Sequence, residues 1–139
     1  MAAPKLGNVL ETGLYVQDLA KARHFYETVM GLEPMFLDER LCAYPLGRGS
    51  VLLIFQQGTT NVPAPTPGGT IPPHEGSGQL HYAFAIAAAD LDAWRRHLAS
   101  FAVPIESEVT WPEGATSLYF RDPDQHLVEL TTPGIWANY

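Results

Sequence analysis

The stretch ETGLYVQDLAKARHFYETVMGLEP, residues 11–34, contains the pattern from which the rest of the fold can be worked out. If residues from Val9 to Val16 form a strand, one of its faces carries the mainly apolar set Leu10, Thr12, Leu14 and Val16, and Glu11 lies on the other face. Asp18 suits a helix N-cap, and apolar residues then recur at helical spacing as far as Met30. Gly31 suits the left-handed position that ends a helix. The stretch therefore predicts a strand followed directly by a helix.

Outward from this stretch, the order of one strand, one helix and three strands occurs twice. The remaining strands of the first module are predicted at Pro34–Asp38, Leu41–Leu46 and Val51–Gln56. The second module is predicted to hold a strand at Gln79–Ile86, a helix from about Asp90, and strands at Ile105–Val109, Ser117–Arg121 and His126–Thr131. With 139 residues, the chain has the size of one domain. We predict an α+β fold, with module one at about 8–57 and module two at about 79–132.

Between the modules, the segment from Gly58 to Gly78 has a different composition. It contains five prolines and shows no periodicity. A loop of this length within a compact domain is typically a linker or a lid over a site. The prolines and glycine-containing turns predict that it forms no regular ladder and is the most mobile part of the chain. His74, which lies in it, could fold over the site as a lid residue, but the expectation is a mobile and solvated side chain.

Composition and charge exclude several classes of partner. The net charge of −7 repels phosphate backbones and anionic lipid, so neither nucleic acid nor membrane is expected as a partner. No apolar run approaches the ~20 residues of a membrane span. The single cysteine, Cys42, cannot form an internal disulfide, which fits a reducing cytosol and predicts a cytoplasmic protein. A hydrophobic content of 46% with 17% charged residues argues against disorder.

Three residues that can bind a metal lie on strand faces that the apolar residues avoid. Glu11 and His81 lie on the first strands of the two modules, and Glu129 lies on the last strand of the second. A single strand His or Glu is usually a surface residue, but these three occupy corresponding faces. Their neighbours Gly13 and Ala83 are small and leave space beside the polar groups, which indicates a lined cavity rather than a packed core. The pattern predicts a site on this face.

Together with residues 11–34, the stretch SLYFRDPDQHLVELTTP, residues 117–133, resembles the vicinal oxygen chelate superfamily. That group includes glyoxalase I, fosfomycin-resistance thiol transferases, methylmalonyl-CoA epimerase, extradiol dioxygenases and bleomycin-binding proteins. The resemblance implies curved mixed sheets around a cavity, with metal ligands at Glu11, approximately Leu53, His81 and Glu129. Leu53 cannot ligate, so three protein ligands are expected, although Gln57 on the same strand face leaves the register open.

One imidazole and two carboxylates would make an oxygen-rich divalent metal site. Such a set suits Mg²⁺ or Mn²⁺ and also accommodates Zn²⁺, Ni²⁺ or Co²⁺. The resemblance places Tyr119 and Arg121 on the cavity face, where Tyr119 could hydrogen-bond a substrate and Arg121 could hold an anionic group. The alternative for Arg121 is a surface residue, or one paired with an Asp, before the turn at Asp122-Pro123-Asp124. The expected catalytic residues are therefore Glu129, Tyr119 and Arg121.

The resemblance leaves three functions open. The first is a metal-dependent enzyme of the glyoxalase or thiol-transferase type, acting on a small oxygenated molecule through chelated oxygens and a stabilised oxyanion. The second is a non-catalytic drug- or metabolite-binding protein of the bleomycin-resistance type. An extradiol-type dioxygenase fits less well, because those enzymes use two histidines and here one is replaced by Glu11. The resemblance also implies a homodimer in which Glu11 of one subunit meets His81 and Glu129 of the other, although a site within one chain is not excluded.

Overall fold

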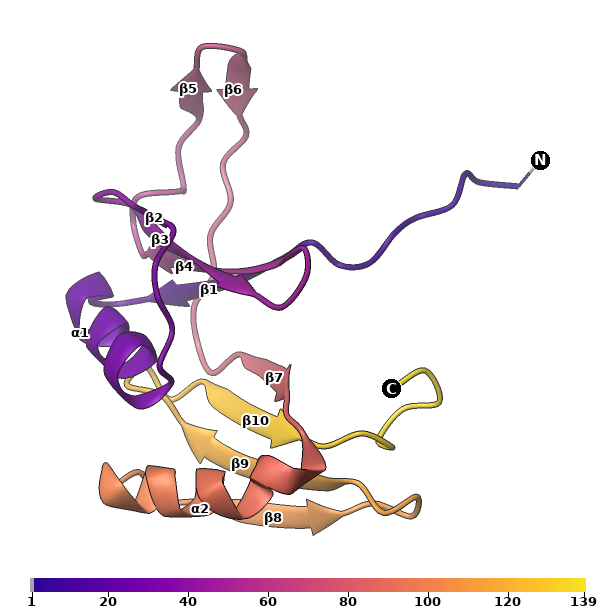
Figure 1. Ribbon diagram of the computed structural model, residues 1–139. Helices are drawn as coiled ribbons and strands as arrows, with labels where there is room; N and C mark the ends of the chain where they lie inside the picture. The colour runs from indigo at the N-terminus through magenta and orange to yellow at the C-terminus, as the bar shows by residue number, and fades with distance from the viewer. Residues whose placement is uncertain (1) are drawn as a thin grey trace.

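A computed structural model describes residues 2–139 and contains two four-stranded sheets, one for each module (Figure 1). The first sheet has the order β1-β4-β3-β2 and is made of β1 (Glu11–Val16), β2 (Phe36–Leu37), β3 (Leu41–Leu46) and β4 (Ser50–Gln56). The second has the order β7-β10-β9-β8 and is made of β7 (His81–Ala85), β8 (Ser107–Thr110), β9 (Thr116–Arg121) and β10 (Leu127–Thr131). In each sheet the first strand pairs in parallel with the last, and the other pairs are antiparallel. The predicted α+β fold of two βαβββ modules is confirmed.

Each module carries one helical segment that is longer than its α-helix. In the first, α1 (Leu19–His24) continues as the π-helical η1 (Phe25–Val29), and in the second the 3₁₀ turn η2 (Ala88–Asp90) precedes α2 (Leu91–Ser100). The Asp18 side chain caps α1 by accepting from the Lys21 N–H at 3.1 Å, as the sequence predicts. Gly31 ends the run with a φ of +70°, a conformation that favours glycine. None of the helices in residues 2–139 is long and apolar enough to cross a membrane.

One hydrophobic core is shared by both modules. The buried residues of β1, including Leu14 and Val16, belong to the same cluster as Phe120 and Leu130 of the second sheet. Inside the core, the Tyr82 hydroxyl donates to Tyr26, and the Tyr26 hydroxyl donates to Asp122 at 2.7 Å. Burial raises the pKa of both phenols and of the Asp122 carboxyl. This polar chain connects the first helical segment to the second sheet.

A buried imidazole forms a second connection between the modules. His126 is 1% exposed, and its Nδ1 accepts from the backbone N–H of Leu80 at 2.9 Å. Since Nδ1 is the acceptor, Nε2 carries the proton, and it lies 2.9 Å from the Tyr15 carbonyl. The ring therefore joins the end of β1 to the residue that precedes β7. His126 belongs to the core and not to the face that carries Glu129.

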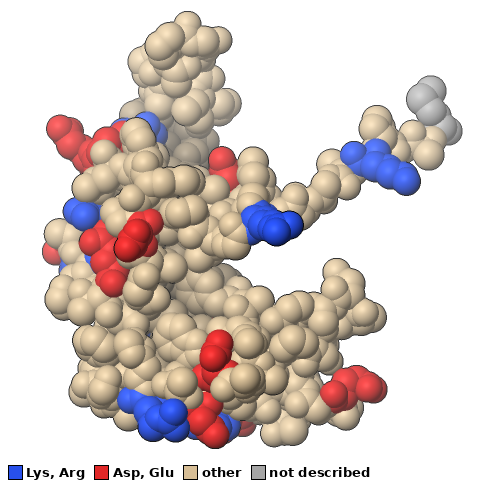
Figure 2. All heavy atoms as spheres, viewed as in Figure 1, with Lys and Arg blue, Asp and Glu red and all other residues tan. Residues whose placement is uncertain are grey.

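The segment between the modules differs from the expectation. It contains a hairpin of β5 (Ala64–Thr66) and β6 (Gly69–Ile71), so the prediction of no regular ladder is wrong. The hairpin tolerates its prolines because an isolated two-stranded ribbon has outer sides where no N–H is needed, and because Pro67 suits the turn. It projects away from both sheets (Figure 1), and its tip is free of charged side chains on the face in Figure 2. Whether it is the most mobile part of the chain stays a prediction.

Candidate metal centre

Two of the predicted ligands lie together on the face of the second sheet that points away from the core. His81 begins β7 and Glu129 lies within β10, which pairs in parallel with β7. Their Nε2 and Oε1 atoms are 3.3 Å apart. The imidazole side chain is 50% exposed, whereas the carboxylate side chain is only 6% exposed. The pair thus combines a buried anionic oxygen with a ring that solvent or a ligand can reach.

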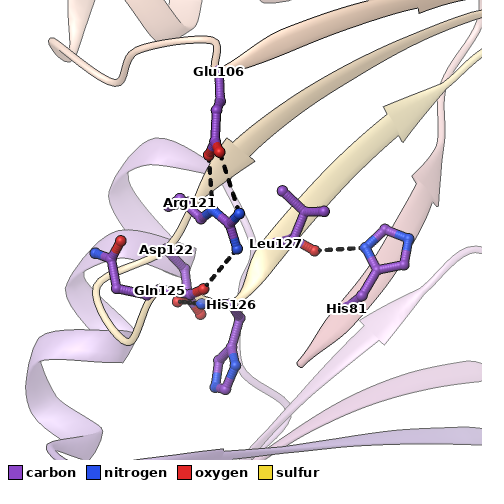
Figure 3. Close-up of polar contacts among 7 residues, drawn as sticks. All are labelled: His81, Glu106, Arg121, Asp122, Gln125, His126 and Leu127. Atoms are coloured by element: carbon purple, nitrogen blue, oxygen red, sulfur yellow. Dashed lines mark hydrogen bonds and ion pairs between the residues drawn. The ribbon is translucent and has the colours of Figure 1, made fainter. Parts of the chain in front are cut away.

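The backbone determines which nitrogen of His81 can bind a metal. His81 Nδ1 lies 2.9 Å from the carbonyl oxygen of Leu127 on β10 (Figure 3). A carbonyl only accepts, so this contact is a hydrogen bond when Nδ1 carries the proton. In the neutral ring, Nε2 then presents a lone pair toward Glu129. Two acceptors at this distance repel each other unless a proton or a cation lies between them, and a divalent metal fits this arrangement.

The other oxygen of Glu129 is held by a side chain that the sequence analysis did not propose as functional. The Ser117 hydroxyl donates to Glu129 Oε2 at 2.6 Å, and Trp111 Nε1 donates to the Ser117 oxygen at 2.9 Å. Ser117 is fully buried. The chain from Trp111 through Ser117 orients the carboxylate so that Oε1 remains directed at His81. Groups that hold a ligand in this way commonly affect metal affinity.

Tyr119 and Arg121 lie on the predicted face of β9. The rings of Tyr119 and His81 have centroids 6.3 Å apart, and burial together with the Glu129 charge raises the pKa of the Tyr119 phenol. Arg121 is held by Glu106, with Nε to Oε2 at 2.8 Å, and donates to the Gln125 carbonyl at 3.1 Å (Figure 3). A substrate anion at Arg121 would therefore compete with a carboxylate that is already bound.

Glu11 lies apart from the other two predicted ligands within one chain. Among residues 2–139, no group of three His, Cys, Asp or Glu side chains could hold a metal ion. Glu11 is exposed at the start of β1, and Leu53 on the neighbouring strand is opposite Gly13. Gln57 does not face this pair, since its amide donates to the Gly76 carbonyl at 3.2 Å. A third ligand for His81 and Glu129 is thus not supplied within these described residues.

Two tandem βαβββ modules with helices on one side of the sheets define the glyoxalase-like fold. The sequence profile of the Glyoxalase/Bleomycin resistance protein/Dioxygenase superfamily matches residues 8–130, and the chain belongs to this superfamily.

Solved structures agree with this assignment. The lactoylglutathione lyase from Agrobacterium tumefaciens is 32% identical, with a TM-score of 0.85 over 96% of this chain and 99% of that one. A glyoxalase/bleomycin resistance protein from Catenulispora acidiphila is 22% identical, with a TM-score of 0.65 over 92% of this chain and 100% of that one. A virulence protein from Salmonella typhimurium is 20% identical, with a TM-score of 0.72 over 93% of this chain and 98% of that one. The last two likenesses concern the fold alone.

Proposed function

We propose that the chain is a metal-dependent enzyme of the glyoxalase or thiol-transferase type that acts on a small oxygenated molecule. The observation that carries this proposal is the 3.3 Å approach of His81 Nε2 to Glu129 Oε1, with His81 Nδ1 engaged by a backbone carbonyl. This is the tautomer in which Nε2 can bind a metal, and the nearest acidic oxygen is already in place. The 32% identity to a lactoylglutathione lyase over 96% of this chain supports the same class of activity.

The donor set fits a divalent cation. Carboxylate and imidazole together suit Zn²⁺, Ni²⁺, Co²⁺, Mn²⁺ or Mg²⁺, and the positive charge would remove the repulsion between the two acceptors. When bound, such an ion would polarise two chelated substrate oxygens. Ser117 keeps the Glu129 carboxylate in position by its 2.6 Å hydrogen bond. The Tyr119 phenol has a raised pKa, so it stays protonated at neutral pH and can donate a hydrogen bond to an oxyanion.

We propose further that the site is completed in a homodimer, where Glu11 of one subunit joins His81 and Glu129 of the other. Apolar side chains beside Glu11 support a contact there: Leu6 is 96% exposed, Val9 75% and Leu10 58%. Residues exposed to this degree in one stretch are typical of a protein contact surface. The stretch extends away from both sheets (Figure 1), in a position to reach a second chain.

Metal analysis tests the proposal directly. Protein purified without chelators and without a nickel column should contain about one divalent ion per chain, as expected for one site per subunit. The change His81→Ala should remove most of it. The matched control is His24→Ala, because His24 is exposed on α1 and makes no hydrogen bond to residues 2–139 through its side chain. If the wild-type protein binds none of the five candidate ions, the proposed metal enzyme is excluded.

Activity distinguishes the enzyme from a binding protein. With the metal found above, the protein is assayed for lactoylglutathione formed from methylglyoxal and glutathione, and then for thiol addition to other small oxygenated electrophiles. We expect turnover that requires the metal and is lost in His81→Ala. Equal binding of bleomycin by the wild-type and His81→Ala proteins, without metal and without turnover, would instead identify a drug-binding protein.

A further inference from the structure

A phenol and an imidazole meet on the face of the first sheet that carries Glu11. The Tyr15 hydroxyl oxygen lies 2.6 Å from His74 Nδ1. Phe55 packs against both rings, with its centroid 5.5 Å from that of Tyr15 and 4.8 Å from that of His74. Tyr15 alternates with the buried Leu14 along β1, so it lies on the same side of the sheet as Glu11. The pair therefore shares a face with a predicted metal ligand.

His74 is half-buried and hydrogen-bonded by the segment around it, so it is not the fully solvated residue that the sequence predicts. Its backbone N–H donates to the Thr60 carbonyl at 2.8 Å. Two residues later, Gly76 accepts from the Gln57 amide at 3.2 Å and lies directly on the Tyr15 ring. A Cβ at Gly76 would be 2.5 Å from a ring carbon of Tyr15, so this approach requires glycine. The phenol and imidazole are thus held in place before any ligand arrives.

The pair keeps hydrogen-bonding capacity for a ligand. Within residues 2–139, the Tyr15 hydroxyl has only His74 as a partner, and His74 Nε2 has none. One proton lies between the hydroxyl oxygen and Nδ1. If the Tyr15 hydroxyl holds that proton, its oxygen can still accept and His74 Nε2 can donate. If His74 Nδ1 holds it, the Tyr15 hydroxyl can donate and His74 Nε2 can accept. A hydroxyl or carbonyl group of a ligand matches either arrangement. Both side chains are half-buried, so part of each remains accessible.

Local charge selects against an anionic ligand. Burial and then the negative charge of Glu75 raise the pKa of the Tyr15 phenol, and the second of these causes makes the potential at the pair more negative. The Glu75 carboxylate is itself held nearby, since its Oε2 accepts from the Gly58 N–H at 2.8 Å. A carboxylate or phosphate placed at Tyr15 and His74 would be repelled. The oxygen of a neutral hydroxyl or carbonyl group would not be repelled.

We propose that Tyr15 and His74 form a distal binding subsite for a neutral hydroxyl or carbonyl group of the substrate, at the end opposite to the metal-chelating oxygens. Tyr15 lies four positions after Glu11 on β1, which corresponds to about 13 Å along the strand. The substrate that fits is elongated and ends in an uncharged polar group. This inference rests on the proposed function, because the metal site anchors the near end of the substrate.

Three hydroxamates test the subsite by calorimetric titration of the metal-loaded protein. Acetohydroxamate is the chelating head alone, and two longer probes carry an alkyl tail of about 10 Å that ends in either a primary alcohol or a carboxylate. The variants are Tyr15→Phe and His74→Leu. Their matched controls are Tyr139→Phe and His24→Leu. Among residues 2–139, the Tyr139 hydroxyl bonds only to backbone carbonyls, at 3.3 and 3.4 Å, and His24 is exposed on α1.

We expect the wild-type protein and both controls to bind the alcohol probe about tenfold more tightly than the carboxylate probe. Tyr15→Phe and His74→Leu should each weaken the alcohol probe by about three- to tenfold, the usual effect of losing one hydrogen bond. Acetohydroxamate should bind all five proteins equally. The ¹⁵N resonances of the His74 ring should also shift with the alcohol probe and not with acetohydroxamate. Thermal melting checks that each variant folds. If His74→Leu does not fold, Tyr15→Phe alone tests the subsite, because it keeps the packed aromatic ring.

Two results overturn the subsite, and they can be told apart. If acetohydroxamate binds but Tyr15→Phe leaves the alcohol probe unaffected, or if the carboxylate probe binds more tightly, the subsite is wrong and the metal site stands. If acetohydroxamate does not bind the metal-supplemented wild-type protein, the proposed function fails and the subsite fails with it.

Discussion

The Ser117 hydroxyl is the side chain through which the geometry of the candidate metal centre can be tested most directly. It donates to Glu129 Oε2 at 2.6 Å and accepts from Trp111 Nε1 at 2.9 Å, in a position without solvent exposure. The change Ser117→Ala removes a donor from a buried carboxylate and an acceptor from a half-buried indole. Losing a hydrogen bond to a charged group costs about 1.5–3 kcal/mol and losing a neutral one costs about 1 kcal/mol, so we expect the free energy of unfolding to fall by about 2.5–4 kcal/mol.

The assay has two readouts. The free energy of unfolding, from urea denaturation, should fall by that amount and lower the melting temperature by about 10 °C. Metal affinity, from competition with a chromophoric chelator, should fall by about 10- to 100-fold, because Glu129 is no longer held. The matched control is Ser107→Ala on the same sheet, where the serine is exposed. Stability and metal affinity equal to those of Ser107→Ala would refute the role assigned to Ser117.

Three further results are expected. Chains with Glu11→Ala and chains with His81→Ala should each lose most of their metal, but their heterodimer should regain about half the wild-type metal, since one of the two symmetric sites is then intact. Subunit exchange without any return of metal, with both measured by mass spectrometry, would contradict the shared site. Thr60→Val should leave the free energy of unfolding unchanged or raise it by up to about 1 kcal/mol in urea denaturation, because the Thr60 hydroxyl is buried without a partner in residues 2–139. Burial raises the pKa of Tyr82 above its unfolded value, so its contribution to stability is complete below about pH 10 and is lost as the pH rises further. Unfolding measured between about pH 8 and 11 should show a shallower decline in Tyr82→Phe, and an unchanged slope would contradict this assignment.

The order of strands and helices could be predicted because local patterns in this chain agree with its tertiary packing. Leu14 and Val16 lie on one face of β1 and are buried, and Gly31 ends the first helical segment with the positive φ that glycine favours. Strand boundaries were less predictable, since the strand expected at Pro34–Asp38 is only Phe36–Leu37 in the structure. Pairing there depends on contacts with β3 that local sequence does not reveal.

The candidate site was only partly accessible to sequence reasoning. His81 and Glu129 could be predicted, because side chains alternate between the two faces of a strand and this alternation alone gives the face on which each residue lies. The hydrogen bond from Ser117 to Glu129 could not be predicted in the same way, since the position of a serine in the sequence does not reveal the partner of its hydroxyl. The nearby Trp111 gave some indication, because a buried indole N–H needs an acceptor. The pairing of Tyr15 with His74 spans 59 positions and depends on how an irregular segment returns to the sheet.

Two hydrogen bonds hold together the ends of the segment that contains the β5–β6 hairpin. The Gly58 N–H donates to Glu75 and the His74 N–H donates to the Thr60 carbonyl, each at 2.8 Å, so residues 61–73 leave and return through neighbouring points. Changing the length of a chain segment between fixed ends costs little, about 0.6 kcal/mol for a doubling. Residues 61–73 are therefore suited to replacement by a recognition peptide or an affinity tag without a change in the strand register of either module. For the same reason, this segment can change in length and sequence during evolution.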